Sequence, residues 1–384
     1  MRISGDVNYS SVFFETPLMF AVHYKMLRVV DHLLENGASV DVYDSKGTTP
    51  LMLAIHHNLE VVAVELLRKG ARSVPLFVVC SGTTLPLLPP IFEYDASPLL
   101  LAVDMGMRRL VPLLIEKDAD VNSATTDESY ALIVAVANKD MDMVELLLEN
   151  GADVDKRDYD SWTPLTVAAA VGNEDALDRL LKANANVSAT GPQGYNAAMI
   201  AIDARLERAS LLLLSMMRDE DLNFAPFDNC TALWLAASNG MDTVVSALLE
   251  RRAHTNTSSL KEGWTALMVA CVKGYVTTVS LLAPRSDREF LDDDACDALM
   301  LACKNGHVGA VVCLLHAGVS FHTTNKWDLT ARDLATINGH MEVLEVLNQS
   351  SGRKRPRSPP TPSFPYAPTP PPSPSSPAPP SPSL

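Results

Sequence analysis

The amino-acid sequence predicts an all-α fold, a solenoid in which short helical repeats stack in a row. An alanine returns ten times along the 384 residues. A position that favours helix initiation, usually threonine, stands five residues before each of these alanines. Successive copies are about 33 residues apart, as from Thr16 to Thr49, except for the longer interval from Thr49 to Ser97. Each unit is too small to bury its own apolar face, so it completes a core only by stacking.

The helix-start positions define ten repeats. They are Thr16, Thr49, Ser97, Tyr130, Thr163, Asn196, Thr231, Thr265, Asp297 and Thr330. The recurring alanines are Ala21, Ala54, Ala102, Ala135, Ala168, Ala201, Ala236, Ala270, Ala302 and Ala335. A methyl group fits where two helices approach closely, which explains the choice of alanine.

The unit from Thr163 to Tyr195 illustrates the predicted repeat. Thr163 can cap a first helix through its hydroxyl, and Pro164 suits the first helical position, where no N–H is needed. Gly172 ends this helix and a second helix begins near Glu174. A hairpin finger then leads to the next repeat.

Each second helix should end on a residue in the left-handed conformation. We therefore expect positive φ at the residues that occupy this place in their repeats. They are Gly37, Gly70, Gly151, Gly318, Asn184, Asp118 and Arg252.

Three stretches resemble ankyrin repeats: TPLMLA at 49–54, TPLTVAAAVGN at 163–173 and NGADVD at 150–155. The resemblance covers roughly residues 6–350. It implies a non-catalytic array whose finger tips and inner helices form a concave binding face. The histidine of the family pattern is replaced in several repeats, by Met19, Met52, Met199, Met268 and Met300.

Three regions follow. Residues 1–15 form a partial finger of a truncated or atypical first repeat, because Gly5-Asp6-Val7-Asn8 matches the start of a finger. Residues 16–350 form the array, with an insertion near 73–96, and residues 351–384 form a disordered tail rich in proline and serine. No capping repeat precedes the first one, so we expect either further repeats upstream or an exposed apolar edge there.

The insertion contains an uncharged run at 73–92 whose length would span a bilayer. Its prolines argue against a helix. An enlarged finger folded onto the array is the favoured interpretation; an exposed partner-docking loop, a membrane segment and a gene-model error are alternatives.

Aromatic side chains on the fingers are the candidate partner-binding residues, because aromatic rings are enriched at interface hot spots. They are Tyr159, Trp162, Tyr195, Trp264 and Trp327. The alternative is that these rings only pack against the neighbouring finger. Acidic residues also gather on the fingers, as at Asp292, Asp293 and Asp294, either for turn chemistry or to steer a basic partner.

The tail can be interpreted as a solvated spacer, but it also contains three kinds of candidate signal. Arg353, Lys354, Arg355 and Arg357 resemble a nuclear import signal, and Arg353, Pro356 and Pro359 fit the spacing of a Src-homology 3 ligand. Candidate phosphorylation sites precede proline at Ser358, Thr361, Thr369, Ser373, Ser376 and Ser381. The tail contributes +4 to a net charge of −15, which leaves −19 for the rest. We expect the basic cluster to fold back transiently onto Asp292, Asp293 and Asp294.

No catalytic, cofactor or metal motif is recognisable, and the six cysteines lack zinc spacing. We therefore expect a monomeric scaffold or inhibitor in the cytoplasm or nucleus that binds a protein, with a basic protein as one candidate. The alternative is a substrate receptor of a ubiquitin ligase. Neither nucleic acid nor membrane is an expected partner, since the acidic array repels phosphates.

Overall fold

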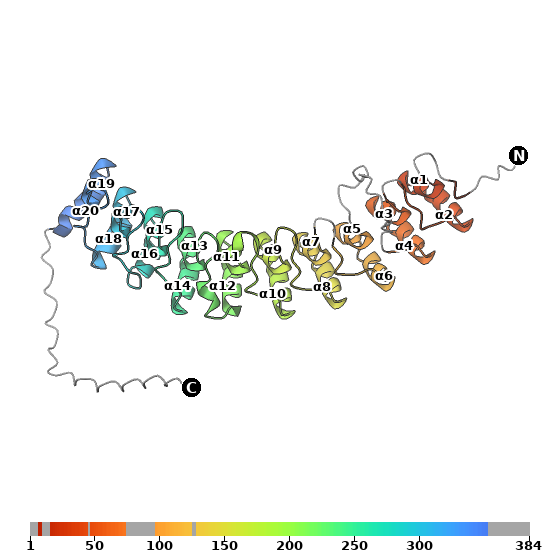
Figure 1. Ribbon diagram of the computed structural model, residues 1–384, viewed down its shortest axis with the longest axis horizontal. Helices are drawn as coiled ribbons and strands as arrows, with labels where there is room; N and C mark the ends of the chain where they lie inside the picture. Colours follow the sequence, from red (N-terminus) through yellow and green to blue (C-terminus); the bar gives the residue numbers. More distant parts are fainter. Residues whose placement is uncertain (1–6, 10–15, 45–46, 74–96, 125–127, 352–384) are drawn as a thin grey trace, which may run out of the picture.

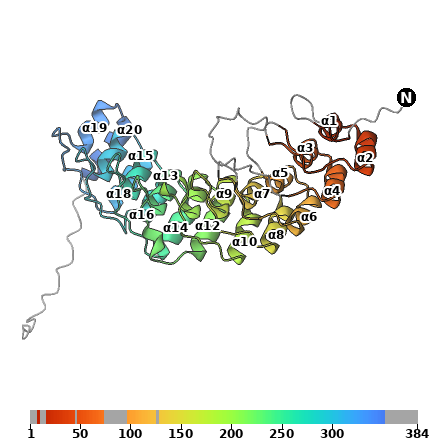
Figure 2. The same cartoon turned by 45° about the vertical axis from the view of Figure 1, so that its right-hand side comes forward.

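The computed structural model describes residues 7–9, 16–44, 47–73, 97–124 and 128–351. Over these ranges the chain is helical, apart from short hairpins and two single 3₁₀ turns. Helix pairs follow one another in a single bowed row, with the odd-numbered helices on the concave side and the even-numbered helices on the convex side (Figures 1 and 2). The predicted all-α solenoid is confirmed.

Each repeat contributes one inner and one outer helix. The inner helices are α1 (Pro17–His23), α3 (Pro50–His56), α5 (Pro98–Asp104), α7 (Ala131–Ala137), α9 (Pro164–Val171), α11 (Ala197–Asp203), α13 (Ala232–Asn239), α15 (Ala266–Lys273), α17 (Ala298–Lys304) and α19 (Ala331–Ile337). The outer helices are α2 (Leu27–Glu35), α4 (Glu60–Arg68), α6 (Leu110–Glu116), α8 (Met141–Glu149), α10 (Glu174–Lys182), α12 (Glu207–Met216), α14 (Asp242–Glu250), α16 (Val276–Leu282), α18 (Val308–His316) and α20 (Met341–Ser351). The 3₁₀ turns are η1 (Pro192–Gly194) and η2 (Asp221–Asn223).

The helix-start residues act as caps. The side chain of every one except Tyr130 accepts a hydrogen bond from the backbone N–H three residues later. All ten recurring alanines are buried, at the contacts between successive inner helices. Both predictions are therefore confirmed, and the repeat register is correct.

The predicted left-handed helix stops are also confirmed. The φ angles are 77° at Gly37, 96° at Gly70, 84° at Gly151, 85° at Gly318, 63° at Asn184, 65° at Asp118 and 61° at Arg252. The last two lack the freedom of glycine and carry the strain that a left-handed side-chain residue costs.

Neighbouring fingers are joined by a repeated hydrogen bond. A side-chain oxygen of an Asp or Asn accepts from the backbone N–H 31 residues later, at 2.6 to 2.9 Å. The acceptors are Asn8, Asp41, Asn122, Asp155, Asn223 and Asn256. Asn8 thus occupies the finger position that its sequence context predicts.

Several apolar side chains of the first repeat are exposed. Phe20 and Tyr24 of the inner layer are exposed, as are Met26, Leu27 and Val29 at the start of the outer helix. In the later repeats the residue at the position of Phe20 is at least partly covered, because a preceding repeat packs beside it.

The array continues across the insertion, whose residues 74–96 lie outside the described residues. Helices α3 and α5 pack together although the insertion separates them, and so do α4 and α6. The Ser73 hydroxyl, just before the insertion, donates to the carbonyl of Lys117 in the next repeat. The insertion therefore leaves the repeat stacking intact.

Two glycine-to-alanine substitutions separate backbone strain from crowding. A Cβ at Gly306 would lie 2.5 Å from Nδ1 of His340, whereas a Cβ at Gly318 would meet no heavy atom within 4 Å. Both positions have positive φ, so each alanine should cost about 1 kcal/mol. We expect Gly306→Ala to lower the free energy of unfolding by a further 1 to 3 kcal/mol or so, measured by urea denaturation. Equal losses would contradict the crowding.

Candidate protein-binding surface

The fingertips present a row of large exposed side chains. Near the tip of successive fingers stand Tyr159 (79% exposed), Phe227 (82%), Leu260 (69%), Leu291 (47%) and Trp327 (55%). Only the finger between Tyr159 and Phe227 departs from this pattern, because it carries Gln193. The row extends along six consecutive fingers.

A cleft of about 440 Å³ lies between the tips of three consecutive fingers, which carry Tyr159, Gln193 and Phe227. Tyr159 and Trp162 come from one finger, Pro192 from the next and Phe227 from the third. The guanidinium of Arg157 donates to the carbonyl of Thr190 at 2.7 Å and so ties the first two fingers together. The cleft joins aromatic walls to a small-residue floor that includes buried glycines, Gly191 and Gly194.

Sequence reasoning found Tyr159, Trp162 and Trp327 but missed Phe227. The signal was available, since Tyr159 and Phe227 each stand four residues before a helix-start position. An alignment of the fingers on that position would have placed both rings at equivalent tips, with one finger between them.

Two other candidate rings have structural roles. The Tyr195 hydroxyl donates to Oδ2 of Asp228 at 2.6 Å, and Nε1 of Trp264 donates to Oδ2 of Asp292 at 3.1 Å. Burial and this hydrogen bond raise the pKa of Tyr195, so the hydroxyl stays protonated. Both rings are half-buried against the core and the neighbouring finger, as the alternative interpretation of these residues described.

Much of the acidic charge on the fingers builds turns. Oδ1 of Asp44, Asp158 and Asp292 each accepts from the backbone N–H four residues later, at 2.7 to 2.8 Å. Asp292 also holds Trp264, and Asp294 pairs with Lys326. Two of the three aspartates expected to receive the basic tail are therefore already engaged within the array.

The tail candidates lie outside the described residues. These are the import candidates Arg353, Lys354, Arg355 and Arg357 and the six phosphorylation candidates from Ser358 to Ser381.

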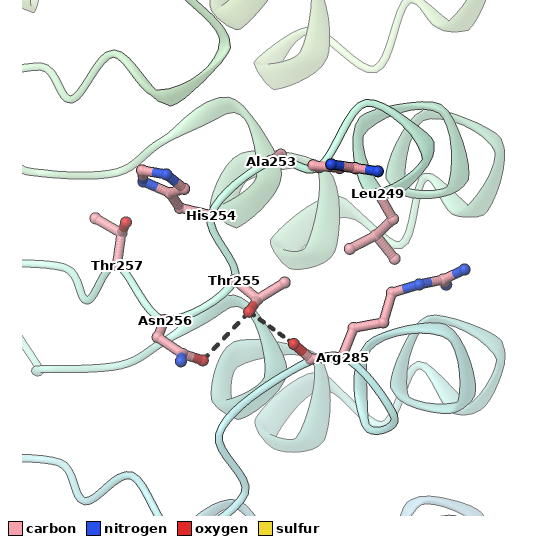
Figure 3. A pocket seen from close by; sticks show the side chains of 8 residues that line it. Leu249, Ala253, His254, Thr255, Asn256, Thr257 and Arg285 are labelled. Carbon is pink, nitrogen blue, oxygen red and sulfur yellow. Dashed lines mark hydrogen bonds between the residues drawn. The ribbon is translucent and has the colours of Figure 1, made fainter. Parts of the chain in front are cut away.

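A second hollow, of about 610 Å³, opens at the base of a finger between two outer helices (Figure 3). Arg252, His254 and Arg285 give it a basic lining. Its central polar groups bind one another: Oγ1 of Thr255 donates to the carbonyl of Arg285 at 3.0 Å, and Oδ1 of Asn256 accepts from the Asp287 N–H. The hollow is thus a junction between repeats.

The histidines form structural contacts. His307 and His340 each place Nε2 within 3.0 Å of a carbonyl in the preceding repeat. His57 and His23 belong to adjacent repeats and lie close together, with Nε2 of His57 3.4 Å from Nδ1 of His23. The sequence did not reveal this contact. Among the described residues there is no group of three or more His, Cys, Asp or Glu side chains that could hold a metal ion.

The described cysteines are reduced and mostly buried, with Cys313 half-buried. Burial raises the pKa of Cys230 and of Cys303 to about 12, so neither thiol ionises readily at neutral pH. In the described part of the chain, no helix has both the length and the apolar character needed to cross a membrane.

Comparison with known proteins identifies the repeat. The family profile described as ankyrin repeats (3 copies) matches residues 4–75, 99–191, 132–224 and 198–290, which together exceed half of the chain. Human ankyrin repeat domain-containing protein 63 is 36% identical over 115 residues, 28% of this chain and 30% of that protein.

Two further relatives are much longer than the matched stretch. An ankyrin repeat and KH domain-containing protein of Caenorhabditis briggsae is 30% identical over 122 residues, 30% of this chain and 4% of that protein. A glycerophosphocholine phosphodiesterase of Candida albicans is 32% identical over 98 residues, 25% of this chain and 8% of that enzyme. The matched stretches thus span less than a third of each of these relatives.

The pKa of His57 tests the contact with His23. Burial and then the neighbouring charge of His23 lower the pKa of His57 below its ordinary value of 6.5. A histidine with a lowered pKa in the folded state favours folding above its ordinary pKa, and this contribution is lost as the pH falls below that value. We expect His23→Gln to move the pKa of His57 upward in an NMR titration, while His322→Gln, on a distant finger, leaves it unchanged. An unchanged His57 in both variants would exclude the coupling.

Proposed function

Because the chain belongs to the ankyrin-repeat family, we propose that it is a non-catalytic interaction module that holds a partner protein on its fingertips and concave face. The observation that carries the proposal is the fingertip row, in which successive fingers expose large apolar side chains to solvent. Side chains of this kind are costly to leave exposed in a series, and contiguous apolar patches mark interaction sites.

The cleft is the strongest candidate within this row. Aromatic residues in well-formed depressions dominate the energetics of protein interfaces. Tyr159, Trp162 and Phe227 surround such a depression, and the hydrogen-bonded fingers hold it in shape. The remaining candidates contribute differently: Trp327 extends the row, whereas Tyr195 and Trp264 support it from below.

The charge of the array favours a basic partner. The formal charge of the whole chain is −15, although the tail contributes four positive charges and no acid. The aspartates of the fingers contribute to this negative charge, which would steer a cationic partner toward the fingertips. Direct nucleic-acid binding is disfavoured for the same reason.

A role as ubiquitin-ligase substrate receptor is the second candidate. In that role the fingertip site would hold the substrate protein and bring it to a cullin complex. Co-purification of cullin subunits with the full chain distinguishes it from a scaffold or inhibitor. The tail signals belong to the same proposal: import through Arg353 to Arg357 places the protein in both cytoplasm and nucleus, and Arg353→Ala with Lys354→Ala should lower its nuclear level.

Removing the cleft rings should abolish partner binding without unfolding the array. We expect Tyr159→Ala with Phe227→Ala to weaken capture of partner proteins by about a hundredfold or more, since truncated hot-spot rings commonly cost about 2 kcal/mol each. The measurement is quantitative mass spectrometry of proteins retained by the full chain and by the variant.

Val61→Ala is the matched control, because Val61 is equally apolar and 84% exposed but lies on outer helix α4. It should retain the wild-type set of partners. A double variant that also retains that set, or a control that loses it, would reject the fingertip site.

A further inference from the structure

Prolines recur in the tail with a strict period of three residues. Nine of them recur at every third residue from Pro356 to Pro380 without interruption, while other prolines are interspersed. We call these nine prolines the ridge; they are Pro356, Pro359, Pro362, Pro365, Pro368, Pro371, Pro374, Pro377 and Pro380. A polyproline II helix has three residues per turn, so in that conformation all nine rings would lie along one face.

The spacing of this ridge matches the spacing of the fingers. Three residues at about 3.1 Å each place successive ridge prolines roughly 9 Å apart. Stacked helices are separated by roughly 8 to 10 Å, and the fingertips repeat with the helices that carry them. One proline of the ridge can therefore meet each fingertip of the array in turn.

The cleft has the composition of a proline-binding groove. Polyproline II segments dock in grooves lined by aromatic side chains, because the conformation is already formed and loses little entropy on binding. Tyr159 and Phe227 stand on alternate fingertips with most of their surface exposed, and Trp162 lies between them at the cleft wall. The finger between them contributes two buried glycines, Gly191 and Gly194, to the lining of the cleft.

We propose that residues 356–380 of this chain dock in cis as a polyproline II helix along its own fingertips, with the ridge prolines over the Tyr159, Trp162 and Phe227 cleft. The proposal rests on the proposed function, since it assigns an occupant to the same site and makes the tail a competitor of the partner. The tail runs from α20 back toward α9, antiparallel to the order of the repeats.

The tail is long enough for this path. From the repeat that starts at Thr330 back to Thr231 is three steps, and back to Thr163 is five, or roughly 30 and 50 Å. About ten residues of polyproline II cover the first distance and about sixteen the second. Counted from the end of α20 at Ser351, residues near Pro362 to Pro368 reach the cleft.

Electrostatic attraction orients the first residues of the docked tail. The four basic residues at 353–357 follow α20 directly in the sequence, and α20 follows the last fingers of the array. Those fingers expose the carboxylates of Asp293 and Asp328. The attraction is modest between exposed charges and is screened by salt, so it orients the tail while the proline ridge supplies the register.

A photo-crosslinker tests the occupant in the full chain. We replace Gln193, an exposed fingertip residue at the cleft, with p-benzoylphenylalanine, and map crosslinks by mass spectrometry. The expected product joins position 193 to residues 359–374 within one chain, at a yield independent of protein concentration. The same crosslinker at Asp175, exposed on outer helix α10, should not capture the tail.

A variant that keeps the composition of the tail tests the phase. Pro365→Tyr with Tyr366→Pro, and Pro368→Thr with Thr369→Pro, move two ridge prolines off the common face. We expect the crosslink yield at position 193 to fall about tenfold, a loss equivalent to about 1.4 kcal/mol. The matched exchange Thr361→Ser with Ser363→Thr leaves every proline in place and should leave the yield unchanged.

Each outcome decides the proposal. A yield at position 193 no higher than at position 175, or crosslinks that form only between chains and grow with concentration, would overturn docking in cis. An unchanged yield in the phase variant would overturn the register. Partner capture is measured separately: if the Tyr159 and Phe227 substitutions abolish capture while no tail crosslink forms, the binding site stands and the tail is not its occupant. If the tail crosslinks but those substitutions leave capture intact, the proposed function fails instead.

Discussion

The close approach of successive inner helices is the constraint on which the rest of this structure depends. Each inner helix packs against the next, and its recurring alanine is buried in every repeat. A larger side chain there would separate two helices and also displace the fingers attached to them, since overpacking a close contact shifts backbone. Because the ten inner helices stack through nine successive contacts, the fingers repeat at a regular spacing.

Hydrogen bonds between neighbouring fingers hold the fingers together as one surface. Some Asp and Asn side chains accept hydrogen bonds from the backbone of the next finger, and others accept hydrogen bonds that close the turn of their own finger. These roles account for much of the acidic composition without reference to a partner. The fingertips are also joined, as by the Leu260 N–H that donates to the carbonyl of Asp228 at 3.0 Å, but the side chains of Tyr159, Phe227 and Leu260 stay largely exposed. The charge and the apolar row therefore have separate origins.

The sequence predicted the repeat unit well because the relevant physics is local. A capping hydroxyl acts three residues away, and a left-handed stop depends on one backbone angle, so Thr163 and Asn184 could be assigned directly. Contacts between repeats were harder to predict. Whether Trp264 faces a partner or Asp292 depends on a hydrogen bond across 28 residues, and His23 meets His57 across 34. The exposed tip at Phe227 escaped for another reason: finger lengths vary, so its offset was hidden until the fingers were aligned.

Period is the property that an array and a polyproline segment can share. A spacer needs proline only to stay extended, and any distribution of prolines serves that purpose. A ridge on one face requires phase, and nine prolines at every third position keep it over 25 residues, from 356 to 380. On a globular partner such a ridge would find one groove of two or three turns. A solenoid instead repeats its fingers at a regular step, and that step is close to the pitch of the ridge. Residual mismatch accumulates along the row, so the contact is tightest over a few fingers, and the cleft between Tyr159 and Phe227 is where the aromatic walls favour that register.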